Sequence, residues 1–99
     1  MDIAKKQDGS ELRIAVAGRI DTTTAQALAA EVSGEALSGI TALILDLADL
    51  EYISSSGLRV LLSAQKIMNK QGMMVVENVS EAVAEVFEIT GFCDILTIQ

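Results

Sequence analysis

The sequence contains no histidine, and its only cysteine is Cys93. Without histidine, neither a Ser-His-Asp centre nor a Cys-His centre can be assembled. A single cysteine excludes an internal disulfide, and no Cys/His cluster has the spacing of a zinc site. Because Cys93 lies close to the apolar residues Phe92 and Ile95, we expect a small buried thiol rather than a reactive one.

Aromatic and basic residues are also scarce. Only three residues are aromatic, so a core must be built from Leu, Ile, Val, Ala and Met. Seven Lys and Arg residues stand against fourteen Asp and Glu residues, which gives a formal charge of −7. A chain of this charge repels phosphate backbones and anionic membrane surfaces. We therefore expect no direct nucleic-acid partner.

Motifs of targeting, membrane insertion and nucleotide binding are missing too. There is no charged-then-apolar leader, and the apolar runs are far shorter than a membrane span, so we expect a cytoplasmic protein without membrane insertion. Neither a P-loop nor G-x-G-x-x-G occurs, and we expect no cofactor and no enzymatic activity. Asp46, Asp49 and Glu51 lack the spacing of a calcium loop, and we interpret them as a solvated loop rather than a weak cation site.

Hydrophobic periodicity predicts a single α/β domain over residues 1–99. We expect strands near residues 3–6, 12–17, 43–47, 73–77 and 94–99, and helices near residues 22–37, 56–71 and 81–90. The order is then β-β-α-β-α-β-α-β, which predicts a mostly parallel sheet packed by helices. The apolar run around Leu43 and Leu45 is typical of a strand that is covered on both faces.

Capping residues mark the predicted helix boundaries. Asp21 or Thr22 is suited to the N-cap of the first helix, because a side-chain oxygen there accepts from free amides of the first turn. Gly72 is a natural stop for the second helix. Ser80 is the expected N-cap of the third.

Three consecutive serines, Ser54 to Ser56, precede Gly57 at a predicted strand-to-helix turn. Capping alone explains serine at such a position. A phosphoacceptor is the second interpretation, because the amides and dipole of a helix N-terminus favour negative charge. Phosphorylation there adds a charge of roughly −1.5 to −2 to the surface and leaves the fold intact.

The predicted second helix has two distinct faces. One face carries Arg59, Ser63, Lys66 and Lys70, and another carries Leu58, Leu61, Ala64 and Met68. Basic side chains along a helix are typical of a solvated face. Beside a modifiable serine, the same stripe fits a docking surface for an acidic partner, and we interpret the turn and the stripe as one interface.

Two segments resemble the signatures of the STAS domain, the anti-sigma-factor-antagonist fold. Gly18-Arg19-Ile20-Asp21 with Thr24-Ala25 resembles the pattern G-x-L-D-x-x-T-A. The run from Asp46-Leu47 through Tyr52-Ile53-Ser54-Ser55-Ser56-Gly57-Leu58 resembles the second signature, D-L-s-x-v-x-y-[DS]-S-[SA]-G-L. The blocks that begin at Gly72 and Val86 also match, so the resemblance covers nearly the whole chain.

The resemblance implies a regulator without catalysis that works as a phosphorylation-controlled partner switch. The unmodified protein binds an anti-sigma factor, itself a serine kinase, and so frees a sigma factor; a serine phosphatase resets the switch. The acceptor is the serine two before the motif glycine, here Ser55, with Asp21 nearby. We expect the partner to contact Asp21, Thr22, Ser54, Ser56, Gly57, Leu58, Arg59, Ser63 and Lys66.

The sequence departs from the family prototype in ways that leave alternatives open. Ser54 stands where founding members carry aspartate, so Ser54 and Ser56 remain possible acceptors. Arg59 stands where the prototype has glycine. An alternative function is a STAS subunit that is never phosphorylated, in a lipid-transport ABC complex or a stress-sensing scaffold. A nucleotide-hydrolysing enzyme is disfavoured, because the phosphate cradle is missing.

Overall fold

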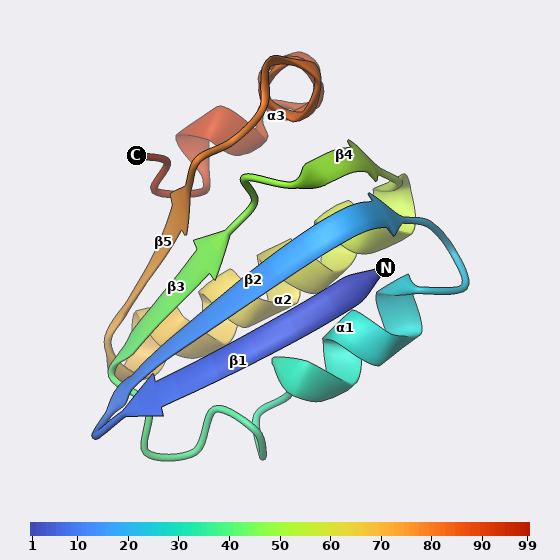
Figure 1. The fold of residues 1–99 in the computed structure, drawn as a ribbon. Coiled ribbons are helices and arrows are strands. Elements are labelled where there is room, and N and C mark those ends of the chain that lie inside the picture. Colours follow the sequence, from blue (N-terminus) through green and yellow to red (C-terminus); the bar gives the residue numbers. More distant parts are fainter.

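The structure is a computed structural model that describes residues 1–99 (Figure 1). Its elements are β1 (Asp2–Asp8), β2 (Glu11–Ile20), α1 (Ala25–Glu31), β3 (Ala42–Asp46), β4 (Leu50–Ile53), α2 (Ser55–Gln71), β5 (Met73–Glu77), α3 (Glu81–Thr90) and the 3-10 turn η1 (Phe92–Asp94). None of the three α-helices combines the length and the hydropathy that crossing a bilayer requires.

The sheet is mixed but mostly parallel, as predicted. Its strand order is β1-β2-β3-β5, and β4 pairs with the second half of β2. Only the β1–β2 hairpin is antiparallel, while the other three pairings are parallel. The β2–β4 register places Ile20 beside Ile53, so the segments that follow both strands leave the sheet at the same place.

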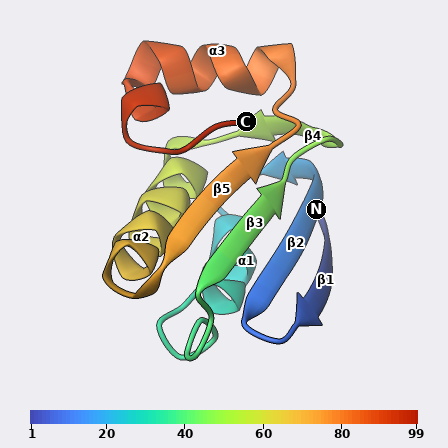
Figure 2. The same ribbon diagram turned by 90° about the vertical axis from the view of Figure 1, so that its left-hand side faces the viewer.

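The core lies between the sheet and the helices α1 and α2, and Val83 and Phe87 of α3 extend it at one end. Leu12, Ile14 and Val16 point to this side of β2 and are at most 3% exposed, as period two predicts. Figure 1 shows α2 behind the strands, and Figure 2 shows α3 across the end at which β3 and β5 finish. The opposite face carries Ile44, which is only half-buried, so the prediction of a strand covered on both faces is wrong.

The structure differs from the prediction in three elements. Strand β4 was not predicted. Its buried residues, Leu50 and Ile53, stand three apart and do not alternate. The expected strand at 94–99 is wrong, because η1 turns the chain there and only Ile98 forms a bridge, to Val76. Helix α1 ends at Glu31 instead of continuing to residue 37.

The early end of α1 has a local cause. Ser33 and Gly34 follow the helix, and both residue types disfavour a helix interior. The Ser33 hydroxyl instead accepts a hydrogen bond from the Ala36 amide at 3.1 Å, which closes a turn. Leu37 and Ile40 still reach the core from the turns that follow. Their burial therefore does not require the helix to continue to residue 37.

Cys93 lies in η1 at the surface and is exposed. The expectation of a buried thiol is therefore wrong. The neighbouring Phe92 is half-buried against the core, while Ile95 is 47% exposed. The apolar neighbours thus mark a short turn on the surface, and they do not surround the thiol.

Candidate partner-binding site at the start of helix α2

Ser54 anchors the start of α2 to the end of β2. Its amide donates to the Ile20 carbonyl at 2.8 Å, which continues the β2–β4 pairing by one residue. Its hydroxyl accepts from the Gly57 amide at 3.2 Å, so Ser54 is the N-cap of α2. The capping interpretation of the serine triplet is confirmed for this one residue.

Ser55 is the first residue of α2, and it is exposed. No hydrogen bond within the chain involves its hydroxyl, whereas that of Ser54 is engaged as the cap. Ser56, the next residue, is half-buried. The three serines thus differ in their surroundings, and Ser55 presents the most accessible hydroxyl at the helix N-terminus.

Gly57 and Leu58 belong to the core rather than to the surface. A Cβ built on Gly57 would stand 2.7 Å from Ile20 Cγ2 and 2.7 Å from Ile53 Cγ1, so the glycine lets α2 approach the sheet closely. Leu58 is 6% exposed and joins the hydrophobic cluster. Both residues are thus buried in the unbound chain, and their contact with the partner stays a prediction.

Asp21 closes a turn directly after β2. Its Oδ1 accepts from the amides of Thr23 and Thr24, each at 2.9 Å, and its own amide donates to the Thr24 hydroxyl at 2.8 Å. The hydrogen bond from the Thr24 amide is the main reason that the pKa of Asp21 lies below its ordinary value. The prediction of Asp21 or Thr22 as the N-cap of the first helix is wrong, because α1 starts at Ala25 and its N-cap position is Thr24, without a side-chain cap hydrogen bond. Asp21 instead closes the turn before the helix, and Thr22 is exposed.

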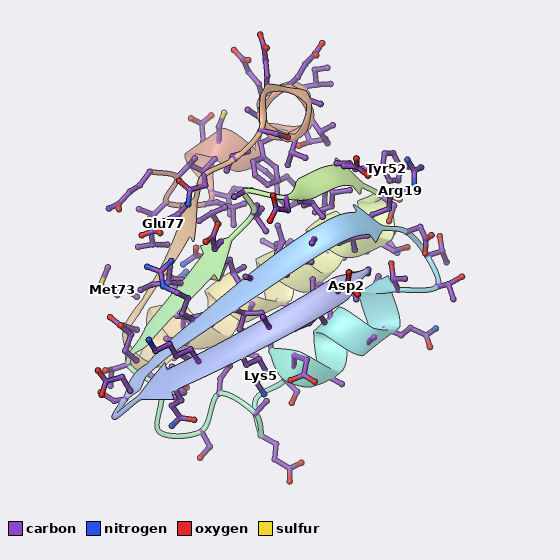
Figure 3. The ribbon with its side chains drawn as sticks, viewed as in Figure 1. Asp2, Lys5, Arg19, Tyr52, Met73 and Glu77 are labelled. Atoms are coloured by element: carbon purple, nitrogen blue, oxygen red, sulfur yellow. The ribbon has the colours of Figure 1, made fainter.

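Arg19 and Tyr52 form a contact that the sequence did not predict. The Arg19 guanidinium carbon lies 4.4 Å from the centre of the Tyr52 ring, a cation–π geometry (Figure 3). The two residues are paired across β2 and β4. Finding this pair required strand β4, which the sequence pattern did not reveal. The contact lies at the same end of the sheet as Asp21 and Ser54.

The two-faced character of α2 is confirmed. Leu58, Leu61, Ala64 and Met68 are buried, and Arg59, Ser63, Lys66 and Lys70 are exposed. The ion pairs of the chain lie elsewhere: Lys5 with Glu31, and Arg13 with Glu77 and Asp46. The three cations of α2 therefore remain unpaired within a chain that carries fourteen acidic residues.

The acidic residues after β3 do not converge on one point. Asp46 accepts hydrogen bonds from the Asn78 side chain and the Ala48 amide, each at 3.1 Å, and the Asn78 bond is the main cause of its lowered pKa. Asp49 and Glu51 are exposed. No group of three or more His, Cys, Asp or Glu side chains could hold a metal ion. Asp46 thus stabilises the ends of β3 and β5.

Known proteins resemble this chain over most or all of its length. The anti-sigma-B factor antagonist of Bacillus subtilis is 33% identical over the full chain, which covers 91% of that protein. BtrV of Bordetella bronchiseptica, described as a candidate anti-sigma factor antagonist, is 40% identical over 82% of this chain and 71% of its own.

Solved structures show the same fold. The anti-sigma factor antagonist SpoIIAA in its unphosphorylated form has a TM-score of 0.78 at 17% identity, over 99% of this chain and 87% of that one. Its phosphorylated form, from Bacillus, also gives a TM-score of 0.78, over 99% and 91% of the two chains. A family model described as the STAS domain matches residues 2–99. The chain therefore belongs to the STAS domain family.

Proposed function

We propose that this protein is an anti-sigma factor antagonist, a regulator without catalytic activity that binds an anti-sigma factor and releases a sigma factor. The names of its relatives support this function. The observation that carries the proposal is the state of Ser55: an exposed hydroxyl without an internal partner, at the first residue of α2 and directly after the capping Ser54. The anti-sigma factor is the serine kinase that modifies Ser55, and a serine phosphatase restores it.

The surroundings of Ser55 suit a phosphate. Amides at the start of a helix and the helix dipole favour negative charge, so the added group does not oppose the fold. Arg59 lies four residues further along α2, on the same side of the helix and without an ion pair. A phosphate of roughly −1.5 to −2 charges next to Arg59 would cancel the positive field at this end of the stripe. Binding to an acidic partner surface would then weaken.

The proposed interface is narrower than the sequence predicted. It keeps the residues that are exposed or half-buried near Ser55, and it omits the buried Gly57 and Leu58. It comprises Asp21, Thr22, Ser54, Ser56, Arg59, Ser63 and Lys66. This interface extends over the end of β2 and the exposed side of α2. A single partner would therefore contact both Ser55 and the basic residues of α2.

Incubation with the cognate kinase and ATP, followed by mass-spectrometric site mapping, tests the proposal. We expect one phosphate, on Ser55, and none on the Ser55→Ala variant. Ser55→Ala should bind the anti-sigma factor constitutively, and Ser55→Asp should bind weakly, although one carboxylate imitates a dianion only in part. Ser56→Ala keeps the acceptor and should still be phosphorylated on Ser55. Ser38→Ala, at an exposed serine outside the interface, is the matched control and should be phosphorylated like the wild type. Stoichiometric phosphorylation of Ser55→Ala would overturn the assignment.

A further inference from the structure

A shallow groove runs between α1 and α2, next to the serine turn. Two adjoining hollows form it and share Ala29, Arg59 and Val60. One hollow reaches Ser56, beside the proposed acceptor, and the other extends to Ile67 near the far end of α2. The groove therefore continues the proposed interface along the two helices.

The side chains that α1 contributes to this groove are small, and the helix is nearly uncharged. Helix α1 has the sequence AQALAAE, and its one charged residue, Glu31, pairs with Lys5 at 2.6 Å. Ala29 is exposed in the groove, and Val60 and Ile67 are half-buried there. Small side chains on one helix allow the backbone of another segment to approach closely. The lining thus offers apolar contact without a competing charge.

The α2 side supplies unpaired positive charge. Arg59 lines both hollows, and Lys66 follows on the same side of the helix. They are seven positions apart, which is about two turns and about 10.5 Å along the axis. No carboxylate of the chain lies within ion-pair distance of either cation. An occupant with carboxylates two turns apart would match both.

We propose that the groove binds one amphipathic helix of the anti-sigma partner, with small or aliphatic residues facing Ala29 and Val60 and acidic residues facing Arg59 and Lys66. The inference rests on the proposed function and assigns a partner element to that site. A helix is the occupant because the furrow between two packed helices can accept the side-chain ridge of a third, in the helix-in-groove mode. The unpaired cations determine its charge.

Two variants of the same helix test the groove. Ala29→Glu places a carboxylate in the groove, and Ala27→Glu places the same group at an exposed position of α1 outside both hollows. Binding is measured by isothermal titration calorimetry against the purified kinase that phosphorylates wild-type Ser55. We expect Ala29→Glu to weaken binding about tenfold or more, and Ala27→Glu to change it less than about twofold. Circular dichroism melting curves establish that both variants are folded.

Photocrosslinking identifies the occupant. A benzophenone amino acid at position 29 should capture an acidic amphipathic helix of the kinase, whereas capture of a loop or of a basic segment would overturn the proposal. Equal affinity of Ala29→Glu and Ala27→Glu would also overturn it, while phosphorylation of Ser55 would leave the proposed function standing. Failure of the wild type to bind or to be phosphorylated would overturn the proposed function itself.

A second copy of the chain is the competing occupant, because α3 is itself acidic and carries the exposed Ile89. Sedimentation equilibrium of the chain alone measures this association. Self-association that Ala29→Glu abolishes and Ala27→Glu preserves would assign the groove to α3 of another copy and overturn the partner-helix proposal. A monomer at the same concentrations supports it.

Discussion

Single residues at the start of α2 have separate tasks. Ser54 caps the helix, Ser55 presents a free hydroxyl, and Gly57 allows the helix to approach β2 and β4. The residue that carries the proposed modification is therefore different from the residues that hold the fold. This separation predicts that function and stability respond to different substitutions within four positions of the chain.

Gly57→Ala should destabilise the protein. Its Cβ would come within 2.7 Å of side-chain atoms of both Ile20 and Ile53, and such overpacking costs about 1–3 kcal/mol. Gly34→Ala is the matched control: nothing lies within 4 Å of its Cβ position, so the substitution should be neutral or slightly stabilising. Urea unfolding followed by circular dichroism measures both. An unchanged unfolding midpoint for Gly57→Ala would show that no such close contact exists.

Asp21→Ala should lower the melting temperature at neutral pH and have little effect in acid. The pKa of Asp21 is lowered in the folded chain, mainly by the Thr24 amide. Its contribution to stability is thus present above the unfolded pKa of about 3.9 and is lost as pH falls through the folded value. Melting curves from pH 7 to pH 3 should therefore converge for the two proteins. Thr22→Ala is the control, and a pH-independent gap for Asp21→Ala would contradict the linkage.

The sequence predicted these residues as a group but not their individual roles. Three adjacent serines offer three possible N-caps. Ser54 takes this position because β4 ends at Ile53, directly before it. The same missing strand explains why the Arg19–Tyr52 contact was not predicted. Gly57 was predicted as important, but for a surface reason, because its buried neighbours come from strands distant in sequence.

At the scale of elements, α2 depends on its N-terminal cap. Ser54→Ala removes the acceptor for the Gly57 amide and should cost about 1 kcal/mol. Ser55→Ala, one residue further, removes no internal hydrogen bond and should change stability by less than about 0.5 kcal/mol. The comparison by urea unfolding separates capping from modification. An equal loss of unfolding free energy in the two variants would contradict the assignment of Ser54 as the N-cap.

Elements with strong local signals were predictable. Helix α2 stops at Gly72, and α3 lies between the capping Ser80 and Gly91, whose φ of +79° suits glycine. Strand β4 lacked such a signal, because four residues with Leu50 and Ile53 buried show no alternation. The prediction of a last strand was wrong although the segment has an apolar pattern. Such a pattern alone does not exclude the turn that η1 makes.

At the scale of the whole molecule, the proposed site lies at one end of the sheet and outside the core. The sheet and the buried faces of α1, α2 and α3 enclose the hydrophobic cluster, while Ser55 lies where α2 begins (Figure 1). Alternation of strands and helices predicted the parallel sheet, but the pairing of β4 with β2 depends on long-range contacts that no local pattern encodes. That pairing is what brings Asp21 and Ser54 to the same edge.

Phosphorylation of Ser55 should therefore leave the fold intact and change only the surface. With phosphoserine installed at position 55, amide chemical shifts should move near residues 19–24 and 54–60, and deuterium exchange of β2, β3 and β5 should match that of the unmodified chain. The exposed hydroxyl and the helix N-terminus accept the charge without disturbing the buried side chains. Faster exchange in β3 or β5 would mean that the modification acts by loosening the core, and the proposed surface switch would then be wrong.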